Sequence, residues 1–322
     1  MRFRLLRGAL EALGLEMRSH RAAILAIQWA VVLSYLVLLI IPAVRPLPPE
    51  EAGILNSLTR FAQFMFWGVW WPFVMASTML LGRVWCGVFC PEGALTEWIS
   101  RYGLGRGVPG WMKWGGWPFV AFLCTTVYGQ LVSVYEYPKA AVIVLGGSTL
   151  AAVAVGLVYG RGKRVWCRHL CPANGVFALL AKLAPIYYQI DRWAWDAAPP
   201  GARTSREHAV NCAPLIDLRR MQTASPCHMC GRCAGERNAV RLSLRSPNAE
   251  LSALNDRVFR WEVALLVFGL LGIALGASQW SASPWFVAIK QHLGAWLVEQ
   301  GWMWPLQSDV PWWVLPHYPE TN

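Results

Sequence analysis

The sequence has 322 residues, of which 56% are hydrophobic and only 15% are charged, a balance that excludes an ordinary soluble domain and indicates a membrane protein. The 20 tryptophans fit this class, because indole rings gather at lipid–water boundaries. A formal net charge of +11 is compatible with nucleic-acid binding, but the positions of the basic residues explain it better through membrane topology.

Five segments are long and apolar enough to cross about 30 Å of hydrocarbon as helices. They are 21–44, 61–82, 115–134, 139–159 and 258–280. The first is too long for the hydrophobic region of a signal peptide, so we read it as a membrane span preceded by an N-terminal segment, 1–20. The fold class that these segments predict is an all-α integral membrane protein.

The basic residues predict the orientation of these spans. Segments 1–21, 83–113 and 160–260 hold 25 of the 29 Lys and Arg residues, and all three lie on the same side of the membrane if the N-terminus is cytoplasmic. This distribution follows the positive-inside rule. It predicts a multi-pass protein of the bacterial inner membrane with a cytoplasmic N-terminus and a periplasmic C-terminus. Membrane lipid is therefore an expected partner, and nucleic acid is not.

The chain contains an internal repeat with an offset of 81 residues. The segment Arg83-Val-Trp-Cys-Gly-Val-Phe-Cys-Pro91 matches Arg164-Val-Trp-Cys-Arg-His-Leu-Cys-Pro172. Each copy follows the second span of a helical hairpin, and the hairpins occupy 21–113 and 114–182. We expect a local twofold arrangement that brings the two copies together at the cytoplasmic face.

The repeated C-x3-C-P motif predicts a cluster site. In a helix, residues i and i+4 share one face, and the proline suits the first turn of the helix that follows. Two such pairs supply the four thiolates that a [4Fe–4S] cluster requires. The predicted ligands of this shared cluster are Cys86, Cys90, Cys167 and Cys171. The alternative of buried structural cysteines is disfavoured by the identical R-V-W flanks, and disulfides are disfavoured on a reducing cytoplasmic side.

A second cysteine cluster lies in the predicted cytoplasmic loop, 183–257. Its C-x2-C-x2-C spacing is typical of three ligands to a [4Fe–4S] cluster. Arg237 stands where the fourth cysteine of a bacterial ferredoxin run would fall, so the fourth ligand has to come from elsewhere. The predicted ligands of this second cluster are Cys212, Cys227, Cys230 and Cys233. The alternative is a zinc site with four cysteine ligands, although such sites usually separate their thiolates into two C-x2-C pairs.

Three further residues near these motifs need an interpretation. His169 and His228 lie inside the cysteine motifs, where they could hydrogen-bond a sulfur or replace a ligand, but we favour a supporting role. Cys124 lies in the middle of a predicted span and is interpreted as a packing residue. No pair of histidines shares one face of a predicted span, so a b-type haem has no support.

The remaining parts of the chain are less specific. The Trp-rich segment 281–322 is predicted to be periplasmic, with an interfacial helix at 284–301 that either anchors the protein or docks a periplasmic partner. A sixth span there would have to accommodate Lys290, His292 and Glu299. A quinone site cannot be placed, since the only polar candidates inside the spans are Gln28, Gln63 and Gln130.

The paired R-V-W-C-x3-C-P motifs, followed by a ferredoxin-like segment and another span, resemble the NapH/NosR/CcoG group of membrane polyferredoxins over residues 20–280. The resemblance implies electron delivery from quinol to periplasmic reductases or, in the CcoG branch, copper reduction during oxidase assembly. The chain departs from the family in having one ferredoxin motif instead of two.

Together these observations predict an iron–sulfur electron-transfer subunit rather than a stand-alone enzyme. It would relay electrons between the quinone pool or a cytoplasmic donor and a respiratory or periplasmic redox partner, through two [4Fe–4S] clusters and with quinone as a further cofactor. One alternative is a cupric reductase or copper-handling assembly factor, because thiolates suit Cu(I). Another is a zinc-stabilised membrane scaffold.

Overall fold

A computed structural model describes residues 2–49, 51–197, 211–221, 223–247, 249–250 and 283–302, together with residues 268, 269, 272 and 276. The helices and strands, in chain order, are α1 (Arg2–Ser19), α2 (Arg21–Val44), α3 (Leu58–Gln63), α4 (Trp71–Leu81), α5 (Pro91–Ile99), α6 (Trp117–Leu131), α7 (Pro138–Ala141), α8 (Gly147–Tyr159), α9 (Val165–His169), α10 (Ala173–Leu180), β1 (Ile186–Ile190), α11 (Arg192–Ala197), β2 (Val240–Leu244) and α15 (Pro284–Glu299).

Three helices of the described chain are long and apolar enough to cross a membrane. They are α2, the continuous helix Leu58–Leu81 that joins α3 to α4, and the continuous helix Pro138–Tyr159 that joins α7 to α8. Each of the two joined helices contains a π-helical stretch, at Phe64–Trp70 and at Val142–Gly146. These three helices fall at the predicted spans 21–44, 61–82 and 139–159.

The other two predicted spans have different outcomes. The segment 115–134 contains α6, whose 15 residues rise only about 22 Å and are shorter than a typical span. Helix α6 ends because the backbone turns at Ser133, which has a positive φ of 49°. The segment 258–280 lies almost wholly outside the described residues, so the five-span arrangement stays a prediction.

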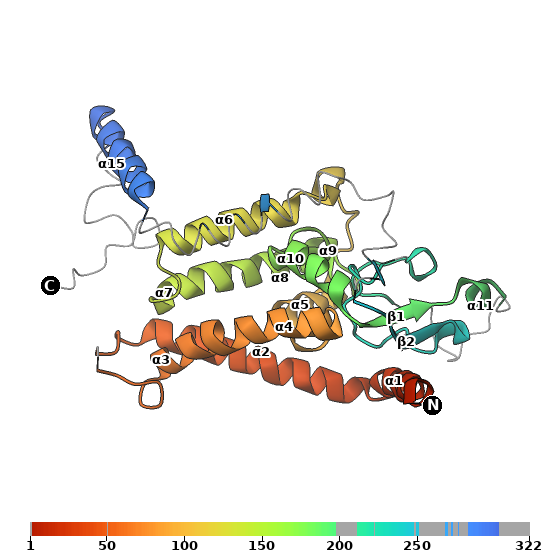
Figure 1. The fold of residues 1–322 in the computed structure, drawn as a ribbon. Coiled ribbons are helices and arrows are strands. Elements are labelled where there is room, and N and C mark those ends of the chain that lie inside the picture. Colours follow the sequence, from red (N-terminus) through yellow and green to blue (C-terminus); the bar gives the residue numbers. More distant parts are fainter. Residues whose placement is uncertain are drawn as a thin grey trace.

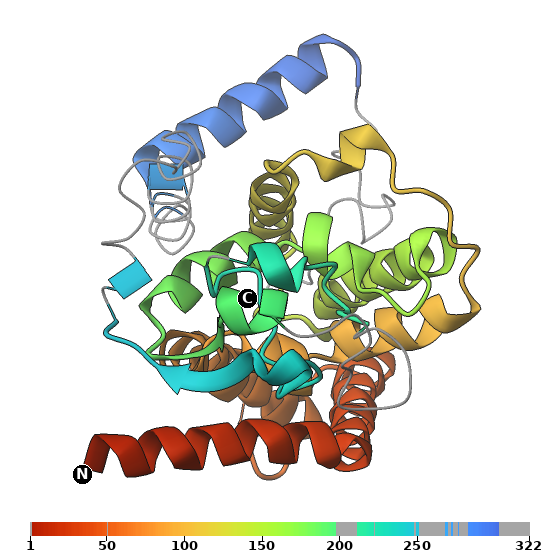
Figure 2. The ribbon, with the colours of Figure 1, turned by 90° about the vertical axis from the view of Figure 1, so that its right-hand side faces the viewer.

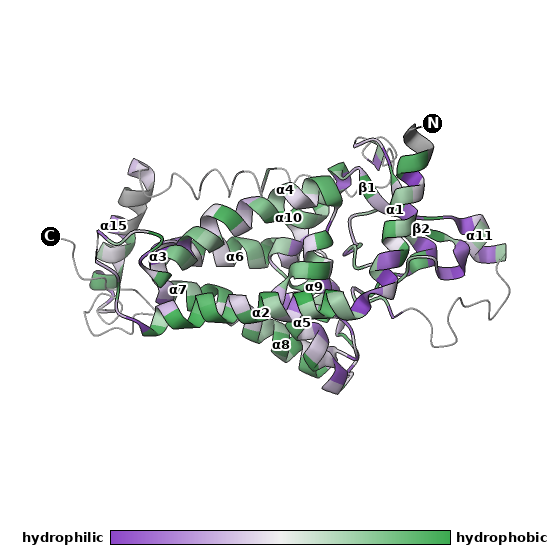
Figure 3. Ribbon diagram, turned by 90° about the horizontal axis from the view of Figure 1, so that it is seen from below, coloured by the Kyte–Doolittle hydropathy of each residue, from purple (hydrophilic) through white to green (hydrophobic). Residues whose placement is uncertain are grey.

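The apolar character of α2 explains how the bundle can sit in lipid. Its buried side chains recur every three or four residues along one face. They are Ile24, Gln28, Val32, Tyr35, Leu39 and Pro42. The opposite face remains apolar and exposed, as at Leu33 and Ile40, which a water-soluble helix would avoid. Figure 3 shows this hydrophobic surface along the helices, with hydrophilic residues gathered at the end that carries β1 and β2.

Both cysteine motifs lie at one end of the bundle, which we call the cysteine end. Figure 1 shows α9, β1 and β2 at this end and α15 at the opposite end. Helix α1 also lies at the cysteine end and runs across the bundle axis, whereas α2 and α6 are seen nearly end-on in Figure 2. The long helices therefore deliver the two motifs to a single face, where α1 and the sheet meet them.

The segment 183–250 adds a small sheet to a largely helical chain. Strands β1 and β2 are antiparallel, with Tyr188 opposite Leu242 and Ile190 opposite Val240. Tyr188, Val240 and Leu242 are buried in one core with Leu10 of α1. The all-α prediction is therefore wrong for this segment, because short alternating runs are hard to recognise as strands outside their tertiary context.

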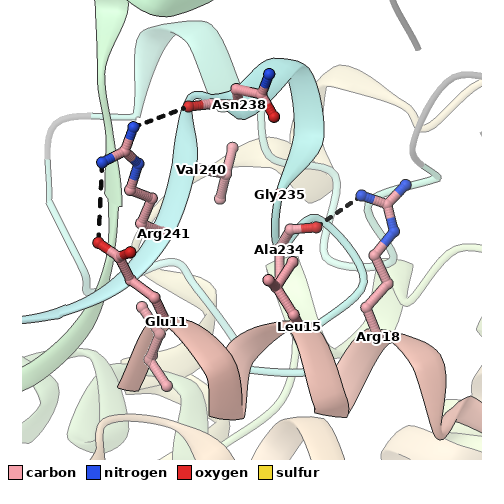
Figure 4. Close-up of a pocket in the computed structure, with 9 residues that line it drawn as sticks. Glu11, Leu15, Arg18, Ala234, Gly235, Asn238, Val240 and Arg241 are labelled. Carbon is pink, nitrogen blue, oxygen red and sulfur yellow. Dashed lines mark hydrogen bonds and ion pairs between the residues drawn. The ribbon is translucent and has the colours of Figure 1, made fainter. Parts of the chain in front are cut away.

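Helix α1 packs directly against this sheet. A Cβ atom placed on Gly14 would lie 3.1 Å from Cβ of Leu242, so the small residue allows a close approach. Figure 4 shows Glu11 and Arg18 of α1 facing the loop and strand β2. Arg18 Nη1 donates to the carbonyl of Ala234 at 2.6 Å, and Glu11 pairs with Arg241 at 3.8 Å. The N-terminal segment is thus part of the cysteine end.

Helix α15 occupies the position predicted for an interfacial helix. It begins at Pro284, which suits the first helical turn, and ends at Glu299. Trp285 and Trp296 on this helix are exposed. Its helical structure is confirmed, and its placement at a membrane surface stays a prediction.

Candidate metal centres

Each C-x3-C-P motif forms the connection between two helices. Helix α4 ends at Leu81, and Gly82, with a φ of 66°, turns the chain toward a π-helical segment, Trp85–Phe89, that contains Cys86. Cys90 is extended and caps α5, with its Sγ accepting a hydrogen bond from Gly93 N–H at 3.4 Å. In the second copy, Cys167 lies in α9 and Cys171 precedes α10. Each proline stands at the start of the next helix, as the motif predicts.

The helix that follows each motif packs on the helix that precedes the other motif. Helix α5, which follows the first motif, packs on α8, where a Cβ atom on Gly156 would lie 2.8 Å from the carbonyl oxygen of Thr96. Helix α10, which follows the second motif, packs on α4 and contributes Phe177 to the core around Val74. This reciprocal packing is the arrangement that a local twofold axis between the repeats produces.

The first arginine of each motif crosses to the other copy. Arg83 Nη2 donates to Asn174 Oδ1 at 2.7 Å, three residues after Cys171. Arg164 Nη1 lies 3.0 Å from the position that a Cβ atom would take on Gly93, three residues after Cys90, and it donates to the carbonyl of Cys86. Positions 93 and 174 are equivalent in the repeat, so each arginine reaches the same region of the other copy, although the hydrogen-bond partners differ.

The four cysteine thiols of the repeats affect one another electrostatically. Burial, followed by Cys167, Cys86 and Glu92, raises the pKa of the Cys90 thiol well above its usual value. The pKa of Cys171 is also raised, by burial first and then by Glu92 and the other three thiols. Such effects weaken with distance, so the thiols of the two copies lie within electrostatic reach of one another. This proximity supports the assignment of the four cysteines to one site, which stays a proposal.

The loop cysteines form a second group. Burial raises the pKa of Cys227 to about 12, and a hydrogen bond from Met229 N–H to its Sγ at 3.4 Å opposes this shift. The pKa of Cys233 is raised by burial and then by Cys227, Cys230 and Cys212. Cys212 therefore lies within electrostatic reach of the C-x2-C-x2-C loop. This proximity supports its assignment as the fourth ligand, which stays a proposal.

Arg237 occupies the position of the missing fourth cysteine and packs on α11. Its φ of 51° is in the left-handed region, and its guanidinium lies 5.0 Å from the ring centre of Trp195 on α11. Its Nη1 also donates to the carbonyl of Trp195 at 3.2 Å. The side chain therefore holds α11 against the loop instead of completing a ligand set.

The donor sets suit iron–sulfur clusters in their chemistry. All nine cysteines are free thiols, and eight of them belong to the two predicted groups of four. Backbone N–H groups donate to Sγ in both groups, at Cys90 and Cys227. Among the described residues, no group of three or more His, Cys, Asp or Glu side chains could hold a single metal ion. A four-iron cluster binds its thiolates at four separate irons, which spreads them more widely than ligands of one ion.

The backbone of the first motif contacts the backbone of the loop motif at Gly87, which lies between Cys86 and Cys90. A Cβ atom on Gly87 would lie 2.0 Å from the carbonyl oxygen of His228 and 2.9 Å from the nitrogen of Cys230. Arg83 joins the same regions, because its Nη1 donates to the carbonyl of Ser225 at 3.0 Å. The site of the repeat cysteines (the repeat site) and the site of the loop cysteines (the loop site) are therefore adjacent.

The two histidines inside the motifs differ in their surroundings. His228 is buried, and burial together with Arg83, Arg164 and Arg168 holds its pKa well below the usual value. Its Nδ1 is buried and has no hydrogen-bond partner in the part of the chain that the structure describes. His169 is half-buried and its pKa is also lowered, first by burial and then by Arg168. In both cases burial and nearby cations favour the neutral imidazole.

Cys124 is exposed on α6 among the described residues. Its interpretation as a packing residue is therefore wrong for the part of the chain that the structure describes. A cysteine in an apolar helix can face outward when the surroundings of the helix are also apolar, so hydrophobicity did not show which side it takes.

Two carboxylates near the sites escaped the sequence analysis. Glu92 accepts a hydrogen bond from Trp166 Nε1 at 3.2 Å, and its burial raises its pKa. Glu97 accepts hydrogen bonds from Arg164 Nε at 2.8 Å and from Arg232 Nη2. Burial opposes ionisation of Glu97, but Arg164 and Arg232 lower its pKa to about 2. The sequence feature that could have identified them is their isolation, since they are the only acidic residues between positions 52 and 135.

Comparisons with known proteins support this interpretation. A family described as a 4Fe-4S binding domain matches residues 63–111 and 144–186, which contain the two C-x3-C-P motifs. A proposed electron transport protein, YccM of Escherichia coli (strain K12), is 25% identical over 252 residues, which cover 69% of this chain and 68% of that protein. No solved structure matches the chain. These similarities support an iron–sulfur protein of electron transport, without distinguishing the NapH/NosR/CcoG group from its relatives.

Proposed function

We propose that the protein is an electron relay of the bacterial inner membrane that passes electrons between the quinone pool or a cytoplasmic donor and a respiratory or periplasmic partner. The observation that carries this proposal is the backbone contact at Gly87, where the repeat site meets His228 and Cys230 of the loop site. Electron tunnelling falls steeply with distance, so two carriers that exchange electrons have to lie close together.

Two [4Fe–4S] clusters would be held by the two groups of thiols. Their ligands would be Cys86, Cys90, Cys167 and Cys171 in the repeat site, and Cys212, Cys227, Cys230 and Cys233 in the loop site. When bound, such clusters supply one-electron oxidation and reduction, with potentials set by net charge, hydrogen bonds to sulfur and solvent exposure.

The chain controls each of these three factors. Gly93 N–H and Met229 N–H donate to Cys90 Sγ and Cys227 Sγ. Val74, Trp85 and Phe177 pack around Cys86 and exclude water from that side of the repeat site. Arg83 and Arg164 lie within electrostatic reach of both groups of thiols, so their positive charge favours thiolates at both sites.

The arrangement of the sites supports electron exchange between the membrane and the cytoplasm, in either direction. The repeat site lies at the ends of the long apolar helices, and the loop site lies beyond it beside the sheet (Figure 1). A membrane-soluble donor such as quinol would therefore exchange with the repeat site, and a cytoplasmic protein with the loop site. A periplasmic partner would contact the segment 281–322, whose last twenty residues lie outside the described chain.

The experiment that tests the proposal is chemical and spectroscopic. The full chain, purified in mild detergent under anaerobic conditions, should contain about eight irons and eight sulfides per chain. Reduction in a redox titration should produce two paramagnetic signals that interact magnetically because the sites are in contact. Protein that is correctly folded but contains no iron, or that contains zinc in its place, would contradict the proposal.

Single substitutions then assign the ligands. Cys86→Ser should remove one cluster and retain the loop cluster, whereas Cys212→Ser should affect only the loop cluster. Cys124→Ser is the matched control, since Cys124 belongs to neither group, and it should retain all the iron. Retention of both clusters in Cys212→Ser would show that another residue supplies the fourth ligand. Proteins that co-purify with the parent chain would identify the redox partner.

A further inference from the structure

A cavity of about 420 Å³ opens at the cysteine end, between the start of α2, helix α5 and the cysteine loop. Its lining includes four arginines and a single carboxylate. These are Arg18, Arg21, Arg101, Arg232 and Glu97. The remaining wall includes Leu25, one turn into the span formed by α2. The cavity is therefore strongly cationic, although it lies beside apolar surface.

One carboxylate in the lining cannot balance four arginines, although Arg18 also pairs with Glu236 at 3.2 Å. Glu97 already accepts hydrogen bonds from Arg164 and Arg232, and its distance to Arg21 Nη2 is 3.7 Å. Among the described residues, Nη1 and Nη2 of Arg21 and Nε of Arg232 are buried and have no hydrogen-bond partner. A buried guanidinium N–H without a partner is costly, and a phosphate oxygen is the acceptor that matches guanidinium geometry best. Four arginines around one carboxylate that is already engaged thus favour an anion in the cavity.

A second, smaller cavity continues from the first along the membrane helices. It has a volume of about 190 Å³ and shares Leu25, Glu97 and Arg101 with the cationic cavity. Its further lining includes Trp29 and Trp98, whose rings meet edge to face at 5.6 Å and are each 41% exposed. An apolar groove therefore leads from the arginines along the surface of a predicted membrane span.

We propose that these two cavities bind an anionic phospholipid, with its phosphate headgroup among the arginines and an acyl chain along Leu25, Trp29 and Trp98. A soluble phosphate would use the cationic cavity but not the groove, whereas a phospholipid uses both. Arg21 is also the first residue of a 24-residue span, where the headgroups of the leaflet at the cysteine end are expected. The predicted cytoplasmic location of this end matches a leaflet rich in anionic lipid. The site does not depend on the proposed electron relay.

Lipid titration of the full chain in mild detergent tests this site, with bound lipid counted by native mass spectrometry. Phosphatidylglycerol should bind with 1:1 stoichiometry at the tightest site, and phosphatidylcholine should bind there at least about tenfold more weakly. Arg21→Gln and Arg101→Gln should each weaken phosphatidylglycerol at that site by about tenfold, which corresponds to about 1.4 kcal/mol. The matched control is Arg220→Gln, an exposed arginine outside both cavities, which should bind like the parent.

Several outcomes would overturn the proposal. Equal binding of the two lipids would show that the arginines do not select the headgroup. Unchanged binding in Arg101→Gln would exclude the cavity as the site, even if Arg21→Gln failed to fold. Displacement of the lipid by millimolar inorganic phosphate would show that the groove adds nothing and that the site binds a soluble anion. Each result is read at constant iron content, so loss of a cluster is distinguished from loss of lipid.

Discussion

Two residues with no role in binding metal have large effects on the cysteine end. Gly87 lets the backbone of the first motif touch the backbone of the loop, since any side chain would overlap His228 and Cys230. Glu97 gathers Arg164, Arg232 and Arg21, three cations that come from distant parts of the sequence. Each residue therefore couples segments that the cysteines alone do not connect.

Substitution of Gly87 tests the backbone contact between the two sites. Gly87→Ala places a methyl group 2.0 Å from the carbonyl oxygen of His228, so one backbone has to move. We expect the loop site to lose its cluster or to separate from the repeat site, with iron falling from about eight to about four per chain. The measurement is iron and sulfide content together with the magnetic interaction between the two signals. Gly107→Ala, which has no atom within 4 Å of the added Cβ, is the control and should retain both signals.

Glu97 predicts a specific dependence of stability on pH. Its pKa is about 2 in the folded protein and near 4.5 in the unfolded chain, because Arg164 and Arg232 favour the carboxylate despite its burial. The group therefore contributes about 3 kcal/mol above pH 4.5, and this contribution is lost as the pH falls toward 2.

Glu97→Gln should accordingly lower the unfolding temperature at pH 7 and reduce its dependence on pH between 5 and 3. Thermal unfolding in detergent, followed by tryptophan fluorescence, measures the difference between the variant and the parent. Glu11→Gln, at a half-exposed ion pair, is the control and should change little. Equal pH profiles for Glu97→Gln and the parent would show that the arginines do not depend on Glu97.

At the scale of elements, the two halves of the repeat are held together because each half packs a helix on the other. Helix α5 packs on the span before the second motif, and α10 packs on the span before the first. The motif arginines follow the same rule, with Arg83 reaching Asn174 and Arg164 reaching the position of Gly93. Each half of the repeat therefore packs on the other half and donates a hydrogen bond to it.

A double-mutant cycle measures the coupling energy between the two halves of the repeat. Arg83→Gln and Asn174→Ala remove the two partners of a 2.7 Å hydrogen bond between the motifs. We expect a coupling energy of about 1.5–3 kcal/mol, as for hydrogen bonds to charged groups, from the unfolding free energies of the parent, the single variants and the double variant. The exposed pair Arg220 and Asp217 provides the control cycle and should show no measurable coupling. Additive effects for Arg83 and Asn174 would contradict the cross-connection.

At the scale of the whole molecule, the charge distribution and the fold agree on one polar end. The hydrophilic residues, the sheet and α1 gather where the cysteines lie, and the opposite end carries the connection between α2 and α3 (Figures 1 and 3). The positive-inside rule predicts that the cysteine end is cytoplasmic. The structure contains the apolar helices, whereas the orientation has to be measured.

Site-directed labelling measures it directly. Leu55 is 98% exposed between α2 and α3, and Trp193 is 89% exposed on α11 at the cysteine end. In a Cys124→Ser background, Leu55→Cys should react with a membrane-impermeant maleimide in intact spheroplasts, and Trp193→Cys should react only in inverted vesicles. The reverse pattern would place the cysteines in the periplasm and would remove the basis for a cytoplasmic donor.

The sequence by itself determined the features that depend on local pattern. Hydropathy predicted the three spans that the structure describes, and the 81-residue repeat identified Cys86, Cys90, Cys167 and Cys171 as one set. Spacing also separated the loop cysteines, and Cys212 was predicted as their fourth ligand because it is the only other thiol near them in the sequence. These features need only the period of a helix and the number of thiolates that a cluster takes, so they can be read without a fold.

The tertiary structure alone decided the contacts between distant residues. Glu97 and Arg164 are 67 positions apart, and no local pattern indicates that they pair. The close approach at Gly87, the strands β1 and β2 and the outward position of Cys124 depend in the same way on neighbours supplied by other segments. The physical reason is that periodicity shows which face of a segment is apolar, whereas only packing determines what each face touches.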